Sequence, residues 1–414
     1  MRLLNAMKNH FVFVLLASLL LAGIISLPTD LRAKNASVAE TIYVTIATDV
    51  IDYYDGACSL REAVINANNN SAPAGVVGEC PAGAGSSDVI YLMDKPIYLD
   101  IKGADEDYAA EGDLDIREGV SIIGVSPAAS VIDANHLDRV FEVIGDGVNL
   151  NLSLVTVRGG YINPAIGWGY GGGLLVNANN SAYINNVEFT NNHASSQSFL
   201  GSGGAIFVYV GAHMTVENSL IDHNISDTYG GGIGNMGELN ITNSTISHNE
   251  GSNTVGSGGL HNNGQISVGY STLAFNSPYA VKSMDGTINE FQGTILASNS
   301  YANCSYSSYA SFTGNYNISS DGSCNFIGTG NLSHVDPKLG PLGSYGGPTW
   351  TYPLLPSSMA IDWIPATGVW SPIQDQRGVP RPQDGNHNGD SSPDVGAVEQ
   401  NFDLRLIYLP LVRR

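Results

Sequence analysis

The chain has 414 residues, and charged residues make up 13% of it, about half of the roughly 25% usual in globular proteins. Hydrophobic residues make up 43%, so the chain can build a core and wholesale disorder is excluded. The formal charge of −21 excludes the clustered basic surface that a nucleic-acid partner requires, and we expect no nucleic-acid binding.

Residues 1–39 are predicted to be a signal peptide. Arg2 and Lys8 precede an uncharged apolar run at residues 11–27, which Pro28 ends, and this order is typical of a secretory signal. Cleavage near residue 33 or after residue 39 fits equally well. A run of about 17 residues also leaves a retained membrane anchor open. We expect an extracytoplasmic protein, secreted or at the cell surface, that meets a membrane only through this signal or an anchor segment.

Four cysteines form two local pairs, Cys58 with Cys80 and Cys304 with Cys324. The long gap between the pairs favours two local disulfides among the three possible pairings, in an oxidising compartment. Each disulfide would close a loop of about 20 residues, worth about 3 kcal/mol in the chain-entropy model. A metal site is less favoured because no CxxC or HxxxH spacing is present, and free thiols remain the alternative.

Residues 40–114 are predicted to form an N-terminal cap that contains one short helix. Ser59 suits the N-cap position. Apolar side chains then follow at the helical spacing i, i+3, i+4 and i+7, at Leu60, Ala63, Val64 and Ala67. Placed over the first turn of a stacked structure, this helix would cover an open apolar end.

Residues 115–335 carry an internal repeat. An apolar residue is followed three positions later by asparagine, at Asn192, Asn224, Asn249, Asn276 and Asn299, with gaps of 32, 25, 27 and 23 residues. A glycine pair precedes four of these asparagines at a similar separation. The short segments between them alternate apolar and polar residues, as strands do. The repeat predicts an all-β coil of roughly nine turns, each adding one strand to several parallel sheets.

The repeated asparagines are predicted to form a structural ladder at one corner of this coil. Stacked turns are separated by the strand spacing of about 4.8 Å. At that distance equivalent asparagine side chains can exchange amide hydrogen bonds along the stack. Asparagine also tolerates the left-handed backbone conformation that a sharp corner requires.

Three groups of residues resemble the motifs of known exported proteins. The GGAI sequence at residues 203–206 and the FxxN sequence at 189–192 resemble the repeats of polymorphic outer-membrane proteins. The sequence at 58–63 resembles the CSLREA motif. The DQRG stretch at 375–378 with Arg381-Pro382, and the D-x-GA-x-E stretch at 394–399, resemble the choice-of-anchor Q domain.

The resemblance implies a right-handed parallel β-helix of the pectin-lyase-like class. It also implies a choice-of-anchor Q-like C-terminal cap at residues 336–400, which we expect over the far end of the coil, and a tail at 401–414 that is a sorting signal or a simple terminal strand. One departure is that the cysteines often found in this domain are absent near Pro372 and Pro393.

Binding or adhesion to polysaccharides or cell-surface proteins is the function we expect. Aromatic residues that can stack on sugar rings lie beside the glycine pairs, at Tyr161, Trp168, Tyr170, Tyr209 and Tyr229. The alternative is a polysaccharide lyase or glycoside hydrolase that uses the lateral groove of the coil. We assign no catalytic residue. The nearest acid–base candidates are Asp222 and His223 beside Asp227, with Glu188 and Glu217 on other turns. The histidines next to the asparagine corners, His193, His223 and His248, are interpreted as solvated corner residues.

No cofactor is firmly predicted, but one segment suits calcium. Asp384, Asn386, Asn388 and Asp390 place oxygen ligands at positions 1, 3, 5 and 7 of a loop, and Asp394 follows at position 11. Position 12, where glutamate is expected, is Val395. Asp-Gly and Asn-Gly steps are also ordinary turn formers, so a plain turn is the alternative.

Overall fold

A computed structural model describes residues 39–72, 78–85, 87–103, 106–164, 169–195, 201–252, 256–284, 287–307, 310–369 and 371–401. The signal peptide predicted at 1–39 and the tail at 401–414 therefore lie almost wholly outside the described residues, as does Trp168. No helix in these ranges has the length and apolar character needed to cross a bilayer.

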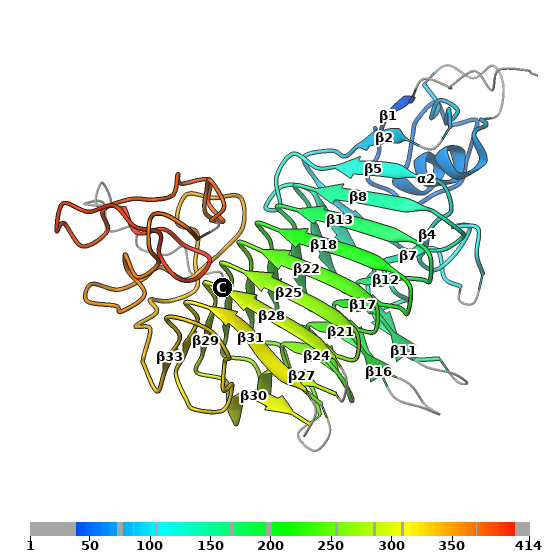
Figure 1. The fold of residues 1–414 in the computed structure, drawn as a ribbon. Coiled ribbons are helices and arrows are strands. Elements are labelled where there is room, and N and C mark those ends of the chain that lie inside the picture. The colour runs from blue at the N-terminus through cyan, green and yellow to red at the C-terminus, as the bar shows by residue number, and fades with distance from the viewer. Residues whose placement is uncertain are drawn as a thin grey trace, which may run out of the picture. The chain divides into compact units, whose positions relative to one another are not determined.

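Three long parallel sheets form a coil in which most turns add one strand to each sheet (Figure 1). Sheet A consists of β1 (Thr41–Tyr43), β2 (Asp88–Tyr91), β5 (Val120–Ile123), β8 (Asn149–Ser153), β13 (Ser181–Asn185), β18 (His213–Glu217), β22 (Glu238–Thr242), β25 (Gln265–Gly269), β28 (Ile288–Gln292) and β31 (Ser311–Asn315). Sheet B consists of β3 (Pro96–Tyr98), β6 (Val131–Asp133), β9 (Thr156–Arg158), β14 (Glu188–Thr190), β19 (Leu220–Asp222), β23 (Thr245–Ser247), β26 (Thr272–Ala274), β29 (Ile295–Ala297), β32 (Ile318–Ser319) and β33 (Leu332–Ser333). Sheet C consists of β4 (Leu114–Ile116), β7 (Phe141–Val143), β12 (Leu174–Val176), β17 (Ile206–Val208), β21 (Ile233–Asn235), β24 (Leu260–Asn262), β27 (Tyr279–Ser283) and β30 (Ala302–Tyr306).

Two small parallel sheets extend some of the turns. One consists of β10 (Tyr161–Ile162), β15 (His193–Ala194) and β20 (Ile225–Ser226), and the other of β11 (Gly169–Tyr170) and β16 (Gly201–Ser202). All pairs of named strands are parallel. A crossover between parallel strands of one sheet is right-handed in about 98% of cases, so the coil is right-handed. The predicted right-handed parallel β-helix is confirmed.

The core is a continuous file of apolar side chains along the inside of the coil. In sheet B, Phe189 pairs in register with Ile221, and Ile221 with Ile246. All three side chains are fully buried. Because parallel pairing is in register from turn to turn, each apolar position of the repeat stacks on its own copies.

Helix α2 (Leu60–Asn69) closes the N-terminal end as the sequence predicts. Ser59 is its N-cap: the Ser59 Oγ accepts a hydrogen bond from the Glu62 amide at 3.1 Å, and the Ser59 amide donates to Glu62 Oε2 at 2.9 Å. The apolar face of α2 packs into the core cluster, and a disulfide joins Cys58 to Cys80. The buried Arg61 pairs with Asp49 at 2.6 Å.

The five asparagines lie in one file along the coil. Each side-chain amide donates to the Oδ1 of the next, from Asn192 to Asn224, Asn249, Asn276 and Asn299, at distances of 2.9–3.2 Å. Each amide also donates to a backbone carbonyl one turn away, as Asn249 does to Ile221 at 2.9 Å. The ladder therefore supplies partners for polar groups that the tight corner buries.

The segment from residue 336 to 401 packs along the side of the coil (Figure 1). The sequence predicts a cap over the far end of the coil instead, and this placement is wrong. The amide of Ala397 donates to Thr272 Oγ1 at 3.1 Å, and Thr349 Oγ1 donates to the carbonyl of Asn218 at 2.9 Å. An apolar cluster joins Tyr270 and Ile295 of the coil to the segment. The outer face of sheet B carries small and apolar residues there, so its burial favours lateral docking.

The far end of the coil is covered by the chain that follows β31. Phe326 packs on Phe312 of the last sheet A strand, with ring centroids 6.1 Å apart, and on Phe291 of the strand before it. The second disulfide, between Cys304 and Cys324, holds this segment against the coil. Both local pairs of cysteines are thus disulfides.

Candidate functional site

An aromatic hollow lies on the outer face of sheet C. The middle residue of each short strand points outward, and in-register pairing brings Phe207, Gly234, His261 and Lys282 into one file. Gly234 has no side chain, and the ring of Phe207 and the hydroxyl of Ser202 fill the space beside it. A Cβ at that position would lie 2.7 Å from the ring of Phe207 and 2.5 Å from Ser202 Oγ.

Aromatic rings form both walls of the hollow. The ring of Tyr170 stacks on that of Phe207 with centroids 4.0 Å apart and planes 8° apart, and Tyr209 contacts Tyr170 edge-on at 6.1 Å. On the other side, Tyr229 lies 4.6 Å from the His261 ring. The hollow has a volume of about 180 Å³ and is lined by Tyr170, Ser202, Phe207, Tyr229, Asn235, Met236, His261, Asn263 and Met284.

His261 gives the hollow a neutral polar group. Burial, with the neighbouring Lys282 adding to it, lowers the pKa of His261 to about 4, so the ring is uncharged at neutral pH. The Nδ1 atom of His261 is buried, and no residue that the structure describes forms a hydrogen bond with it. An apolar site with a few such polar groups is the usual form of a small-ligand site.

The structure brings together three of the five aromatic residues that the sequence pointed to, Tyr170, Tyr209 and Tyr229. Tyr161 lies elsewhere, edge-on to His193 at 5.2 Å. Sequence reasoning missed Phe207 and His261. Their signal is positional, because each follows the inward apolar residue that comes after a glycine motif and so must face outward.

A second cluster lies on sheet B, where Asp222 ends β19. The Nδ1 atoms of His223 and His248 lie 2.5 Å and 3.0 Å from the two carboxylate oxygens of Asp222. Burial opposes ionisation of Asp222, but the hydrogen bonds from both imidazoles hold its pKa below the usual range. The bond to Asp222 raises the pKa of His223.

The other acid–base candidates do not join this cluster. His193 Nε2 pairs with Asp227 Oδ1 at 2.7 Å. His193 also lines a shallow hollow of about 440 Å³ with Tyr161 and His223. Asp222 and Asp227 are close in the sequence, but Asp222 contacts His223 and His248, whereas Asp227 contacts His193.

A largely buried carboxylate cluster lies on the outer face of sheet C, where Asp115 pairs in register with Glu142. Arg139 pairs with Asp113 at 3.0 Å and with Glu142, and Asp115 is fully buried beside them. Burial raises the pKa of Asp115 to about 7. A basic group beside carboxylates is the arrangement that a lyase needs, but Arg139 is paired with Asp113 and Glu142, and Asp115 is fully buried.

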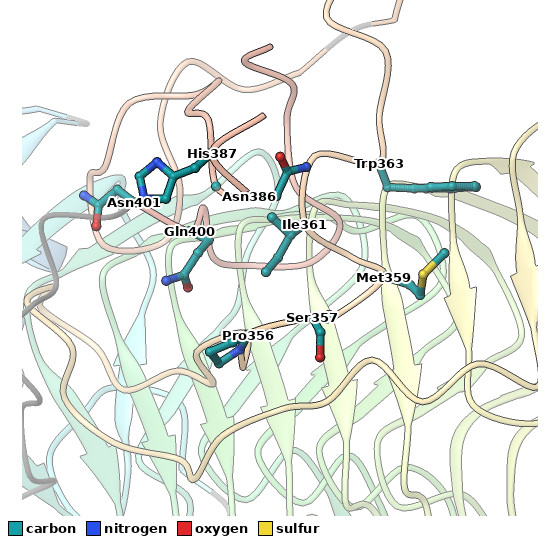
Figure 2. A pocket seen from close by; sticks show the side chains of 11 residues that line it. Pro356, Ser357, Met359, Ile361, Trp363, Asn386, His387, Gln400 and Asn401 are labelled. Carbon is teal, nitrogen blue, oxygen red and sulfur yellow. The ribbon is translucent and has the colours of Figure 1, made fainter. Parts of the chain in front are cut away.

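The loop predicted to bind calcium forms part of a pocket wall in the C-terminal segment. Asn386 and His387 line a pocket of about 920 Å³ together with Trp363 and Met359 (Figure 2). The oxygens of Asp384, Asn386 and Asn388 accept backbone amides within the loop. Asp394 is buried, and its carboxylate accepts the amides of Asp362 and Gln400, so it does not extend the loop. Calcium binding stays a prediction.

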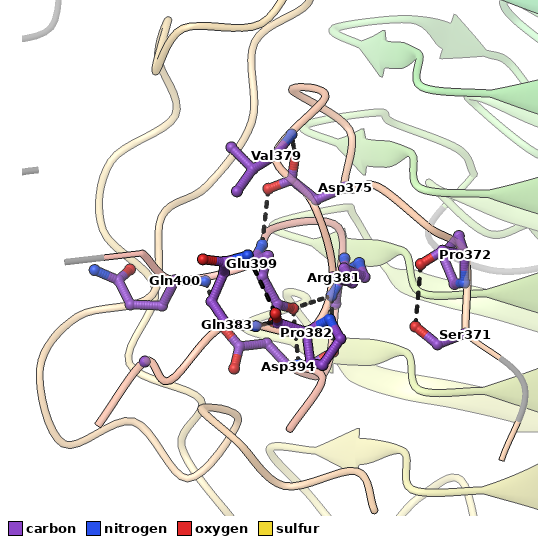
Figure 3. A network of polar contacts seen from close by, with 12 residues as sticks. Ser371, Pro372, Asp375, Val379, Arg381, Pro382, Gln383, Asp394, Glu399 and Gln400 are labelled. Carbon is purple, nitrogen blue, oxygen red and sulfur yellow. Dashed lines mark hydrogen bonds and ion pairs between the residues drawn. The ribbon is translucent and has the colours of Figure 1, made fainter. Parts of the chain in front are cut away.

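The two C-terminal motifs form one buried polar network (Figure 3). Arg381 donates to Glu399 Oε2 at 2.7 Å and to the carbonyls of Asp394 and Gly396. Asp375 accepts the guanidinium of Arg377 at 2.6 Å and the amide of Glu399 at 2.8 Å. These residues have a structural role that holds the segment together.

Gln376 of the DQRG stretch joins this segment to the coil. Its Oε1 accepts a hydrogen bond from Thr245 Oγ1 of β23 at 2.7 Å, and its Nε2 donates to Thr349 Oγ1 at 2.9 Å. The motif thus serves docking as well as internal packing.

No protein-family model matches the chain, and no curated protein matches it. One solved structure, pectate lyase Pel9A, is similar. It has 13% sequence identity and a TM-score of 0.45, over 89% of this chain and 98% of the other. The similarity is one of fold, and the β-helix rests on the strand pairing described above.

Proposed function

We propose that this chain is an exported surface protein that binds glycans in the aromatic hollow of sheet C. The observation that carries the proposal is the stack of Tyr170 on Phe207 beside the neutral, buried His261. Flat aromatic faces suit the apolar faces of sugar rings. The buried Nδ1 of His261 has no hydrogen-bond partner among the described residues, and a sugar hydroxyl would supply one if the rings around it shift.

Export is supported by the two disulfides, which are typical of oxidising compartments, and by the predicted signal at residues 1–39. The resemblance to CSLREA, polymorphic outer-membrane-protein and choice-of-anchor Q motifs supports a place at the cell surface. We also propose that the tail at residues 401–414 is the sorting signal that attaches the protein to the cell surface.

Binding is favoured over turnover because no carboxylate lines the hollow among its described residues. A glycoside hydrolase needs two carboxyl groups about 5–9.5 Å apart on either side of the substrate. The carboxylates of sheet C at Asp115 and Glu142 are held by Arg139 and neighbouring backbone. Hydrolase or lyase activity is therefore the alternative that the experiment must exclude.

The test is a polysaccharide panel screened for both binding and product release with the secreted protein. We expect one glycan class to bind, and Tyr170→Ala and Tyr229→Ala to weaken binding more than tenfold, the loss typical of a central aromatic contact. Tyr43→Ala is the matched control, because Tyr43 and Tyr91 form an exposed stacked pair on sheet A, away from the hollow.

Three outcomes would contradict the proposal. Release of reducing ends or unsaturated sugars would make the chain an enzyme. Equal losses for Tyr43→Ala and Tyr170→Ala would remove the hollow as the site. Adhesion to whole cells without binding to any glycan would identify a protein as the partner.

A further inference from the structure

We propose that Asp222, His223 and His248 form a binding site for a divalent transition metal ion of the Zn²⁺ class. The three side chains each offer one ligand atom, and these atoms lie within 4.8 Å of one another. The cluster is separate from the aromatic hollow, since it lies on sheet B and the hollow on sheet C.

The repeat itself brings the two histidines together. Asp222 pairs in register with Ser247, so His223 and His248 follow equivalent positions on adjacent turns. Both residues have left-handed backbone, with φ of 54° and 49°, just before the ladder residues Asn224 and Asn249. Their rings therefore leave the coil in the same direction, and they stack with centroids 4.8 Å apart and planes 18° apart.

Two imidazoles sharing one carboxylate distinguish this cluster from simple ion pairs. His193 with Asp227 and His213 with Glu238 each place a single imidazole on a carboxylate. Here both Nδ1 atoms point at Asp222. A dication that binds both Nδ1 atoms needs each ring as a neutral imidazole with its proton on Nε2, and any further proton is released to solvent. It draws the ligands in to bond lengths of about 2.0–2.2 Å.

The ligand set selects the kind of metal. Two imidazole nitrogens and one carboxylate oxygen suit Zn²⁺, Co²⁺, Ni²⁺ or Cu²⁺, whereas Ca²⁺ and Mg²⁺ prefer oxygen alone. Three protein ligands leave a fourth position for water. His223 is 58% exposed in its side chain, so solvent reaches that position.

Neighbouring groups hold the ligands in place. Ser247 Oγ donates to Asp222 Oδ1 at 2.7 Å, and Asn224 Nδ2 donates to the Asp222 backbone carbonyl at 3.0 Å. The His248 ring stacks on Phe275 at 5.6 Å and contacts Tyr352 of the C-terminal segment. Such supporting contacts orient metal ligands and raise affinity.

The test uses tag-free, chelator-treated mature protein, with Zn²⁺ titrated by calorimetry and Co²⁺ followed by its visible absorption. We expect one equivalent to bind, a higher melting temperature with Zn²⁺, and a Co²⁺ spectrum typical of nitrogen ligation. His223→Ala and His248→Ala should each weaken binding at least about tenfold. His213→Ala is the control and should bind as the wild type does, because His213 pairs with Glu238 on sheet A.

If His223→Ala or His248→Ala fails to fold, Asp222→Asn is tested in its place, because asparagine keeps the shape of the aspartate side chain. A metal-free melt matching the wild type would show that each variant is folded. The proposal is overturned if the wild type takes up no Zn²⁺ or Co²⁺, or if His223→Ala and His248→Ala bind as tightly as His213→Ala.

Discussion

The side chains of Asn224 and Asn249 are hydrogen-bonded across adjacent turns. Asn224 Nδ2 donates to Asn249 Oδ1 at 2.9 Å, and the backbone N–H of Asn224 donates to the same oxygen at 3.0 Å. One carbonyl oxygen thus satisfies two donors at a buried corner. The same pattern repeats from Asn192 to Asn299, so each turn fixes the height and direction of the next. It also fixes the direction in which His223 and His248 leave the coil.

Asn249→Ala is expected to lower the free energy of unfolding by about 2–3 kcal/mol, because the buried backbone N–H of Asn224 loses its acceptor and the side-chain bond between Asn224 and Asn249 is lost. Thermal or urea unfolding measures this change. Asn240→Ala is the control, since Asn240 is exposed on β22 and should alter stability by less than about 0.5 kcal/mol. Equal stability of the two variants would show that the ladder contributes nothing measurable.

Gly234→Ala is expected to reduce glycan binding while the chain still folds. The added methyl group would lie 2.7 Å from the ring of Phe207 and 2.5 Å from Ser202 Oγ, so these side chains, which line the hollow, must shift. We expect at least about a tenfold loss of affinity, the cost of losing one good contact region. Binding assays combined with a melting curve check this, and unchanged affinity would place the ligand elsewhere.

The fold could be predicted because a β-helix repeats one simple rule. Glycine and asparagine at fixed spacing mark corners that only a few residue types tolerate, and inward positions must be apolar. Ser59 and the spacing after it likewise define α2 from local chemistry alone. Such signals need no knowledge of distant contacts.

The candidate sites were harder to predict because they combine residues from several turns. The sequence places Asp222 nearest to His223 and Asp227, yet the structure gives Asp222 a second histidine, His248, from the next turn. The lateral docking of residues 336–401 was missed for a similar reason. The docking depends on small and apolar residues that point outward from sheet B, such as Thr272 and Ile295. Their spacing is that of the repeat itself, so the sequence does not distinguish a docking face from an exposed one.

The free energy of unfolding is expected to fall as the pH rises from about 4 to 7, because Asp115 has a raised pKa in the folded state. Its folded pKa is about 7, above the ordinary value of 3.8, so the folded state holds this proton more tightly than the unfolded state does. Its contribution is complete below about pH 4 and is lost as pH rises through 7, with a slope of at most about 1.4 kcal/mol per unit. Asp115→Asn should flatten this part of a pH–stability profile. An unchanged profile would contradict the assignment.

Arg381→Met is expected to release the C-terminal segment from the coil. Arg381 is buried and pairs with Glu399, so its removal leaves an uncompensated buried carboxylate, at a cost of about 3–5 kcal/mol. We expect faster limited proteolysis within residues 336–401 and a lower melting temperature. The control is Arg158→Met, because Arg158 is partly exposed beside Asp133 and should cost at most about 1 kcal/mol.

Calcium is expected to raise the melting temperature through the loop at Asp384, Asn386, Asn388 and Asp390. The backbone amides already turn the first three side chains inward around the loop, so little ordering is needed on binding. Affinity should be weak, in the millimolar range of extracellular sites, because Val395 replaces the bidentate glutamate and Asp394 is buried. Asp384→Asn should abolish the calcium-dependent rise and leave the calcium-free melt nearly unchanged. A chelator-insensitive melt of the wild type, or the same calcium response in Asp384→Asn, would establish that this loop is a plain turn.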